Sequence, residues 1–83
     1  MPKFLHIAFN FEGRSSSSRD DAIKKAMDTG IDWYKYAPNC WLIWTNRTPK
    51  KWYDILKPKI HADDSIFITE IEMSNSFGYL PRV

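Results

Sequence analysis

The chain has 83 residues and a net charge of +2, with 12 lysines and arginines against 10 acidic residues. This length allows one domain with a small core. The charge permits nucleic-acid binding without indicating it, because dedicated binders usually carry a clearly basic face. No run approaches the ~20 apolar residues of a membrane span. The lone cysteine, Cys40, excludes an internal disulfide and, with no signal peptide visible, predicts a cytoplasmic protein.

The first expected strand covers residues 4–11, where apolar and mixed positions alternate. Leu5, Ile7 and Phe9 belong to the uniformly apolar set, which should face the helices. The intervening positions, including His6, are mixed and should form the opposite face, where His6 is expected to make an ordinary interface contact. A serine-rich polar loop follows at residues 12–19.

Residues 19–29 predict a short helix with one apolar face. Ser17 or Ser18 is expected to cap its N-terminus, and Gly30 is expected to end it in the left-handed conformation. Acids precede lysines by four positions, so two surface ion pairs are expected: Asp20–Lys24 and Asp21–Lys25.

The segments 32–37 and 40–45 predict an antiparallel hairpin, with the turn at Pro38–Asn39. Both strands carry bulky residues on both faces, including Trp33 opposite Tyr34. A sheet with one face in water would normally carry polar residues on that face. With 16% aromatic residues in the chain, this pattern favours a surface for self-association or ligand binding.

Thr48 and Pro49 predict the start of a second helix, with a capping hydroxyl followed by proline at the first helical position. Trp52 lies in its apolar stripe, and Pro58 should end or kink it. Residues 65–72 then predict the fourth strand. The order strand, helix, hairpin, helix, strand favours one α+β domain over residues 1–83. The expected fold is ferredoxin-like β-α-β-β-α-β, an antiparallel four-stranded sheet with both helices on one face.

Several stretches carry a resemblance to a known family: HIAFNF, YAPNCWLIWT, TPKKWYDILKP and DDSIFITEIE. They resemble the small CRISPR-associated adaptation subunit, the Cas-two family, and its uncharacterised Cas-two-like branch. The resemblance covers almost the whole chain and implies a ferredoxin-like homodimer in a bacterial or phage defence context. Its tail, residues 73–83, would extend the sheet of the dimer mate through Phe77, Tyr79 and Leu80.

The resemblance also implies a metal-dependent nuclease site at the end of the first strand, where the family has an aspartate. The matching position here is Asn10, whose neutral amide is a weaker Mg²⁺ ligand than a carboxylate. Glu12 could serve as the metal ligand instead. The alternative interpretation is ordinary strand-end polarity, with Asn10 bonded to the backbone.

Other candidate binding groups are basic. Arg14 and Arg19 flank the serine run and could form an anion site at a helix N-terminus; a flexible loop is the alternative. Lys50, Lys51, Lys57 and Lys59 could contact phosphates beside Trp52 and Tyr53, although exposed lysines often serve only solubility.

Two remaining sets of residues are candidates for catalysis, and a structural role is favoured for each. His61 and Asp63 could pair as acid and base, but a solvated loop is favoured. Cys40 is expected to fill space rather than act as a nucleophile, and one cysteine cannot build a zinc site.

Three function classes therefore stay open. The favoured one is a non-catalytic dimeric module that binds nucleic acid or a protein and needs no cofactor. The second is a Mg²⁺-dependent nuclease using Asn10 or Glu12 across the dimer. The third is a mobile-element inhibitor of a bacterial defence complex.

Overall fold

The computed structural model describes residues 1–12 and 17–71. It has an α+β architecture in which two helices accompany a four-stranded antiparallel sheet. The elements follow one another as β1 (Lys3–Asn10), α1 (Ser17–Met27), β2 (Asp32–Ala37), β3 (Cys40–Thr45), α2 (Pro49–Leu56), the 3₁₀ turn η1 (Lys57–Lys59) and β4 (Ser65–Ile71). The predicted α+β class and order of elements are confirmed.

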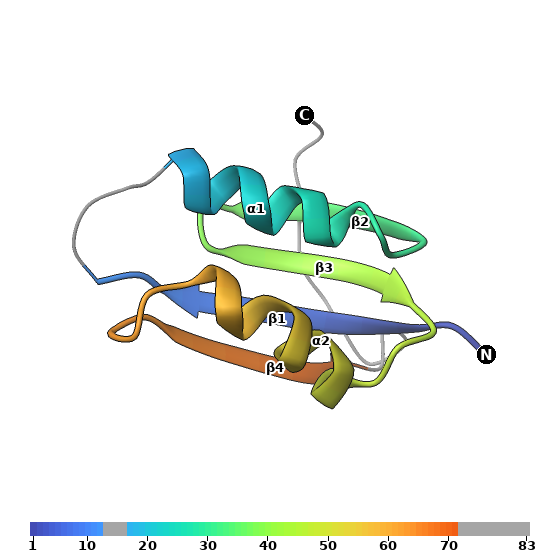
Figure 1. The fold of residues 1–83 in the computed structure, drawn as a ribbon. Helices are drawn as coiled ribbons and strands as arrows, with labels where there is room; N and C mark the ends of the chain where they lie inside the picture. Colours follow the sequence, from blue (N-terminus) through green and yellow to red (C-terminus); the bar gives the residue numbers. More distant parts are fainter. Residues whose placement is uncertain (13–16, 72–83) are drawn as a thin grey trace.

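The strands lie in the order β2-β3-β1-β4, and every neighbouring pair is antiparallel. Both helices lie over the same face of the sheet, α1 towards β2 and β3, and α2 towards β1 and β4 (Figure 1). This arrangement is compatible with a ferredoxin-like fold.

The core lies between the helices and the sheet. The apolar set of β1 supplies its centre, since Leu5 and Ile7 are fully buried. Ile7 lies opposite Trp41 on β3 and Ile68 on β4, so one register joins three strands through apolar pairs. The helices contribute Ile23, Ala26, Met27, Trp52 and Leu56.

Helix α1 differs from its prediction at the N-terminus. It begins at Ser17, so Ser17 and Ser18 are helical and neither is the cap. The expected Asp20–Lys24 and Asp21–Lys25 ion pairs do not form. Within the described ranges the ion pairs are Arg19–Asp20, Arg19–Asp64 and Lys50–Asp54.

Gly30 also differs from its prediction, because it does not adopt the left-handed conformation. A Cβ at this position would lie 2.8 Å from Cδ1 of Ile43 and 3.3 Å from the carbonyl oxygen of Met27. Glycine is therefore needed here for close packing between the end of α1 and β3.

Helix α2 begins as predicted. The Thr48 hydroxyl accepts a hydrogen bond from the backbone N–H of Lys51, and Pro49 occupies the first turn. Trp52 is fully buried, and its indole N–H donates to Thr45 Oγ1 at 3.1 Å. This bond satisfies the polar atom of the largest buried side chain.

Candidate functional site

The candidate site is the sheet face turned away from both helices, here named the far face. Strand alternation and register assign its residues. They are Phe4, His6, Ala8, Asn10, Asp32, Tyr34, Tyr36, Ala37, Cys40, Leu42, Trp44, Ser65, Phe67, Thr69 and Ile71. No helix in the described ranges covers this face (Figure 1).

Aromatic side chains pair across the strands of the far face. Phe4 on β1 and Trp44 on β3 are register partners, and their ring centroids lie 4.5 Å apart. His6 Nε2 is hydrogen-bonded to the Tyr36 hydroxyl. Phe67 on β4 is 66% exposed, which is unusual for a phenylalanine at the middle of a strand. These contacts preorganise an apolar surface that still offers exposed ring area.

Alternation along β2 places Tyr36 on this face, and a bulge brings the next residue, Ala37, opposite Cys40. The register between β2 and β3 shifts between Lys35 and Ala37, so Tyr36 and Ala37 both lie near Cys40. Burial raises the pKa of Tyr36, and the neighbouring Cys40 thiol raises it further. Tyr36 therefore stays neutral beyond the pH at which an ordinary tyrosine ionises.

The far face is poor in charge. Among the described strand residues, lysine and arginine are absent from it, because Lys3 and Lys35 belong to the opposite face. Asp32, at the start of β2, is its carboxylate. A surface of this composition suits a protein partner better than a polyanion, which requires basic contacts.

Asn10 and Glu12, the predicted metal and catalytic residues, lie close together at the end of β1. The Asn10 amide donates to Glu12 Oε1 at 3.4 Å, and both residues are exposed. The structure adds Asp64, whose Oδ1 accepts the backbone N–H of Glu12 at 2.8 Å. No group of three or more His, Cys, Asp or Glu that could hold a metal occurs in residues 1–12 and 17–71.

Asp64 is a structural residue in the connection before β4, the same connection in which His61 and Asp63 were expected to form a solvated loop. Its side chain is buried and also accepts the His61 backbone N–H at 2.9 Å. Burial would raise the pKa of Asp64, but the bonds from Glu12 and His61 and the charge of Arg19 bring it below its usual value. The sequence showed the neighbouring acids Asp63 and Asp64, but it did not show that the backbone N–H of Glu12 would bond to Asp64.

Arg19, predicted as an anion-binding residue, is 6% exposed. Its guanidinium lies 3.8 Å from the centre of the Phe11 ring and 3.7 Å from Asp64 Oδ2. These contacts hold α1 against the end of β1 and the connection before β4. Arg14, its predicted companion, lies outside the described residues.

The predicted basic cluster lies on α2 and η1. Lys51 is exposed, whereas Lys57 and Lys59 are half-buried. Lys50 pairs with Asp54 at 2.9 Å. The cluster lies on the helix side of the sheet, on the opposite side from the far face (Figure 1). Phe77, Tyr79 and Leu80, the predicted dimer contacts, lie outside the described residues.

Comparison with protein-family models, with curated proteins and with solved structures found no match. In the part of the chain described, no helix is long and apolar enough to cross a membrane.

Proposed function

We propose that this chain is a non-catalytic, Cas-two-like module that forms a homodimer through its far face. The observation that carries the proposal is an aromatic sheet face that lacks lysine and arginine within the described strands. Exposed apolar patches of this kind characterise interaction surfaces.

A second copy of the chain is the partner that this surface fits. In a twofold dimer the same patch meets itself, so any strong charge would meet its own image. The pairs that join the strands of the far face, Phe4 with Trp44 and His6 with Tyr36, contain neither lysine nor arginine. Aromatic residues are also those most often found at the energetic centre of interfaces.

Like charges introduced at Phe67, the exposed phenylalanine of the far face, provide the test. In light scattering coupled to size exclusion, the wild-type chain should be a dimer and Phe67→Lys a monomer. Tyr53→Lys is the matched control, because Tyr53 is an exposed aromatic residue on α2, away from the far face. A wild-type monomer, or a Phe67→Lys dimer as tight as the wild type, would refute the proposal.

The resemblance assigns a second part of this interface to the tail, through Phe77, Tyr79 and Leu80. Removing residues 76–83 should then weaken dimerisation in the same assay. A truncated chain that dimerises as tightly as the full chain would remove the tail from the proposal and leave the far face as its basis.

Nucleic-acid binding is the second candidate function, favoured by the exposed lysines on the helix side. A dimer joined through the far face would leave uncovered both the exposed Lys51 and the half-buried Lys59, since they lie on α2 and η1. Titration with labelled single- and double-stranded RNA and DNA should show affinity that falls with salt. Lys51→Glu with Lys59→Glu should abolish it, whereas Lys25→Glu on α1 should have a smaller effect.

The same titration with Mg²⁺ tests the nuclease alternative. Cleavage that is lost in Glu12→Gln would support it, and unchanged cleavage in that variant would exclude Glu12. Without nucleic-acid binding at low salt, a protein partner becomes the leading candidate, including the defence complex that a mobile-element inhibitor would block.

A further inference from the structure

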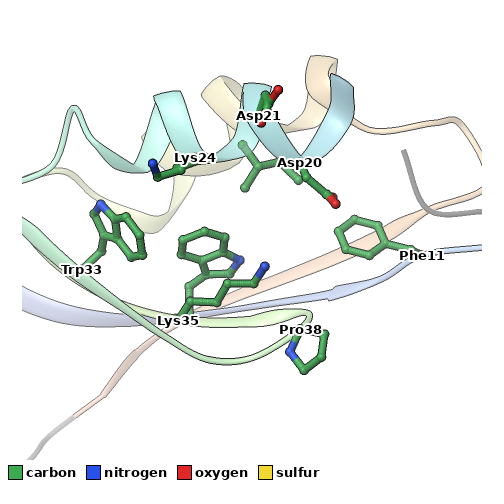
Figure 2. A pocket seen from close by; sticks show the side chains of 9 residues that line it. Phe11, Asp20, Asp21, Lys24, Trp33, Lys35 and Pro38 are labelled. Atoms are coloured by element: carbon green, nitrogen blue, oxygen red, sulfur yellow. The ribbon is translucent and has the colours of Figure 1, made fainter. Parts of the chain in front are cut away.

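A cavity of about 300 Å³ lies between α1 and the β2–β3 hairpin, on the helix side of the sheet. This volume falls at the lower end of the range in which proteins hold small organic molecules. Its walls include three aromatic side chains, and Figure 2 shows Trp33, Phe11 and Pro38 around the opening below α1. Trp41 contributes a further wall, with its ring centroid 4.9 Å from that of Trp33.

Trp33 is held in place at this wall. Its indole N–H donates to Asp28 Oδ1 at 2.7 Å, and its backbone N–H donates to the Asp32 side chain at 2.8 Å. Trp41 is 4% exposed and belongs to the core. Two fixed, tilted rings therefore present flat apolar surface to the cavity, which suits a flat aromatic group.

The charges around the cavity favour an anion. Lys35 extends across it between Trp33 and Phe11 (Figure 2), with Nζ 5.2 Å from the centre of the Trp41 ring. Lys24 also lines the cavity. In the described ranges, neither lysine has an ion-pair partner.

The two acids of the lining are less available to a ligand. Asp20 pairs with Arg19 at 3.6 Å. The carboxylate of Asp21 points away from the cavity, above α1 (Figure 2). Within the described ranges, the lining therefore holds two lysines without an ion-pair partner, one acid beside the guanidinium that Asp64 also contacts, and one acid that points away.

We propose that this cavity is a binding site for a small, flat aromatic carboxylate. The ring lies against Trp33 and Trp41, and the carboxylate accepts hydrogen bonds from the ammonium group of Lys35, which extends across the cavity. The site lies on the opposite side of the sheet from the far face, so it does not depend on the proposed dimer. An inward-pointing lysine on an edge strand also discourages strand addition, but that role requires no cavity.

The test uses naphthoate and the full chain, followed by the tryptophan indole N–H signals in a nitrogen–proton correlation spectrum. Naphthoate should shift the signals of Trp33 and Trp41 more than that of Trp52. Naphthylmethanol, which keeps the rings and lacks the charge, should bind about tenfold more weakly. Lys35→Met should weaken the binding of naphthoate by a similar factor and leave the affinity for naphthylmethanol unchanged.

The control is Lys25→Met, because Lys25 lies on α1 and does not line the cavity. This variant should bind naphthoate like the wild type. Tighter binding of naphthylmethylammonium than of naphthoate would overturn the anion assignment. Absence of shifts at Trp33 and Trp41 with millimolar naphthoate would overturn the site, whatever the oligomeric state.

Discussion

Asp64 joins three parts of the chain through one buried carboxylate. It accepts backbone N–H groups from Glu12 and His61 and lies 3.7 Å from the Arg19 guanidinium. A buried N–H group that loses its acceptor destabilises the fold, because it has given up its hydrogen bonds to water without a replacement. The end of β1, the start of α1 and the connection before β4 therefore depend on this side chain.

Asp64→Asn should lower the melting temperature at neutral pH, because the amide supplies one acceptor oxygen instead of two and carries no charge for Arg19. The pKa of Asp64 is lowered by folding, so its stabilisation is complete above the pKa of an unfolded aspartate, about 3.9. It is lost as pH falls through the lower folded pKa. Thermal melts should therefore separate the two proteins at neutral pH and converge in acid.

Asp63→Asn is the control for this prediction, since Asp63 is the exposed neighbour. It should melt close to the wild type across the same pH range. A difference between wild type and Asp64→Asn that stays constant down to strongly acidic pH would show that the charge of Asp64 is not what stabilises the fold.

Gly30→Ala should destabilise the chain by about 1–3 kcal/mol, the usual cost of forcing extra volume into a packed site. The added methyl would meet Ile43 Cδ1, a fully buried atom, at 2.8 Å. Denaturant titration measures the change. Because Ile43→Val removes that atom, Gly30→Ala should cost less in the Ile43→Val background. Equal costs in both backgrounds would place the strain at the contacts that Ile43→Val keeps, Ile43 Cγ1 at 3.1 Å and the Met27 carbonyl oxygen at 3.3 Å.

Helix α2 combines a strong local start signal with a strong tertiary anchor. The Thr48 cap and Pro49 lie next to each other in the sequence, and Trp52 is bonded to Thr45 on β3. The cap sets where the helix begins, and the indole bond sets how it sits on the sheet. This helix was therefore predicted more accurately than α1, before which four consecutive serines offered several possible caps.

Thr48→Ala should reduce the free energy of unfolding by about 1 kcal/mol, because the Lys51 backbone N–H loses its acceptor. Thr48→Ser keeps the hydroxyl and should retain most of the stability. Chemical denaturation compares the three proteins. A Thr48→Ser variant as unstable as Thr48→Ala would mean that the methyl group, not the cap bond, matters at this position.

The molecule has two sheet faces that differ in what covers them. The core face meets both helices, and the far face meets none in the described part of the chain (Figure 1). A small domain has little stability to spare, so burying the far face in a dimer would stabilise the fold as well as the interface. Folding and association should then be linked.

This linkage predicts a melting temperature that rises with protein concentration. The rise should persist at high salt, because lysine and arginine are absent from the described strand positions of the far face. Thermal melts across a concentration series in low and high salt provide the measurement. A melting temperature independent of concentration, in a protein that is monomeric by scattering, would contradict the linkage.

The strands and helices were predictable because their signals are local. Alternation in β1, the Pro38–Asn39 turn and the Thr48–Pro49 start depend on residues a few positions apart. The hydrogen bond from Trp52 to Thr45 and the close approach of Gly30 to Ile43 join different elements, so the local pattern did not predict them. The left-handed stop expected at Gly30 was wrong because glycine is favoured both by a left-handed backbone and by close packing, and the sequence alone does not distinguish the two.

What the local pattern could not supply is pairing over long separations. Asp64 meets Glu12 across 52 positions, and His6 meets Tyr36 across 30. The hairpin showed bulky residues on both faces, but the strand order and the positions of the helices were needed to show which face stays uncovered. The cavity beneath α1 likewise exists only once the helix is packed over Trp33 and Trp41. Sequence patterns record which residues prefer to be buried, whereas the choice of partners depends on how the whole chain closes on itself.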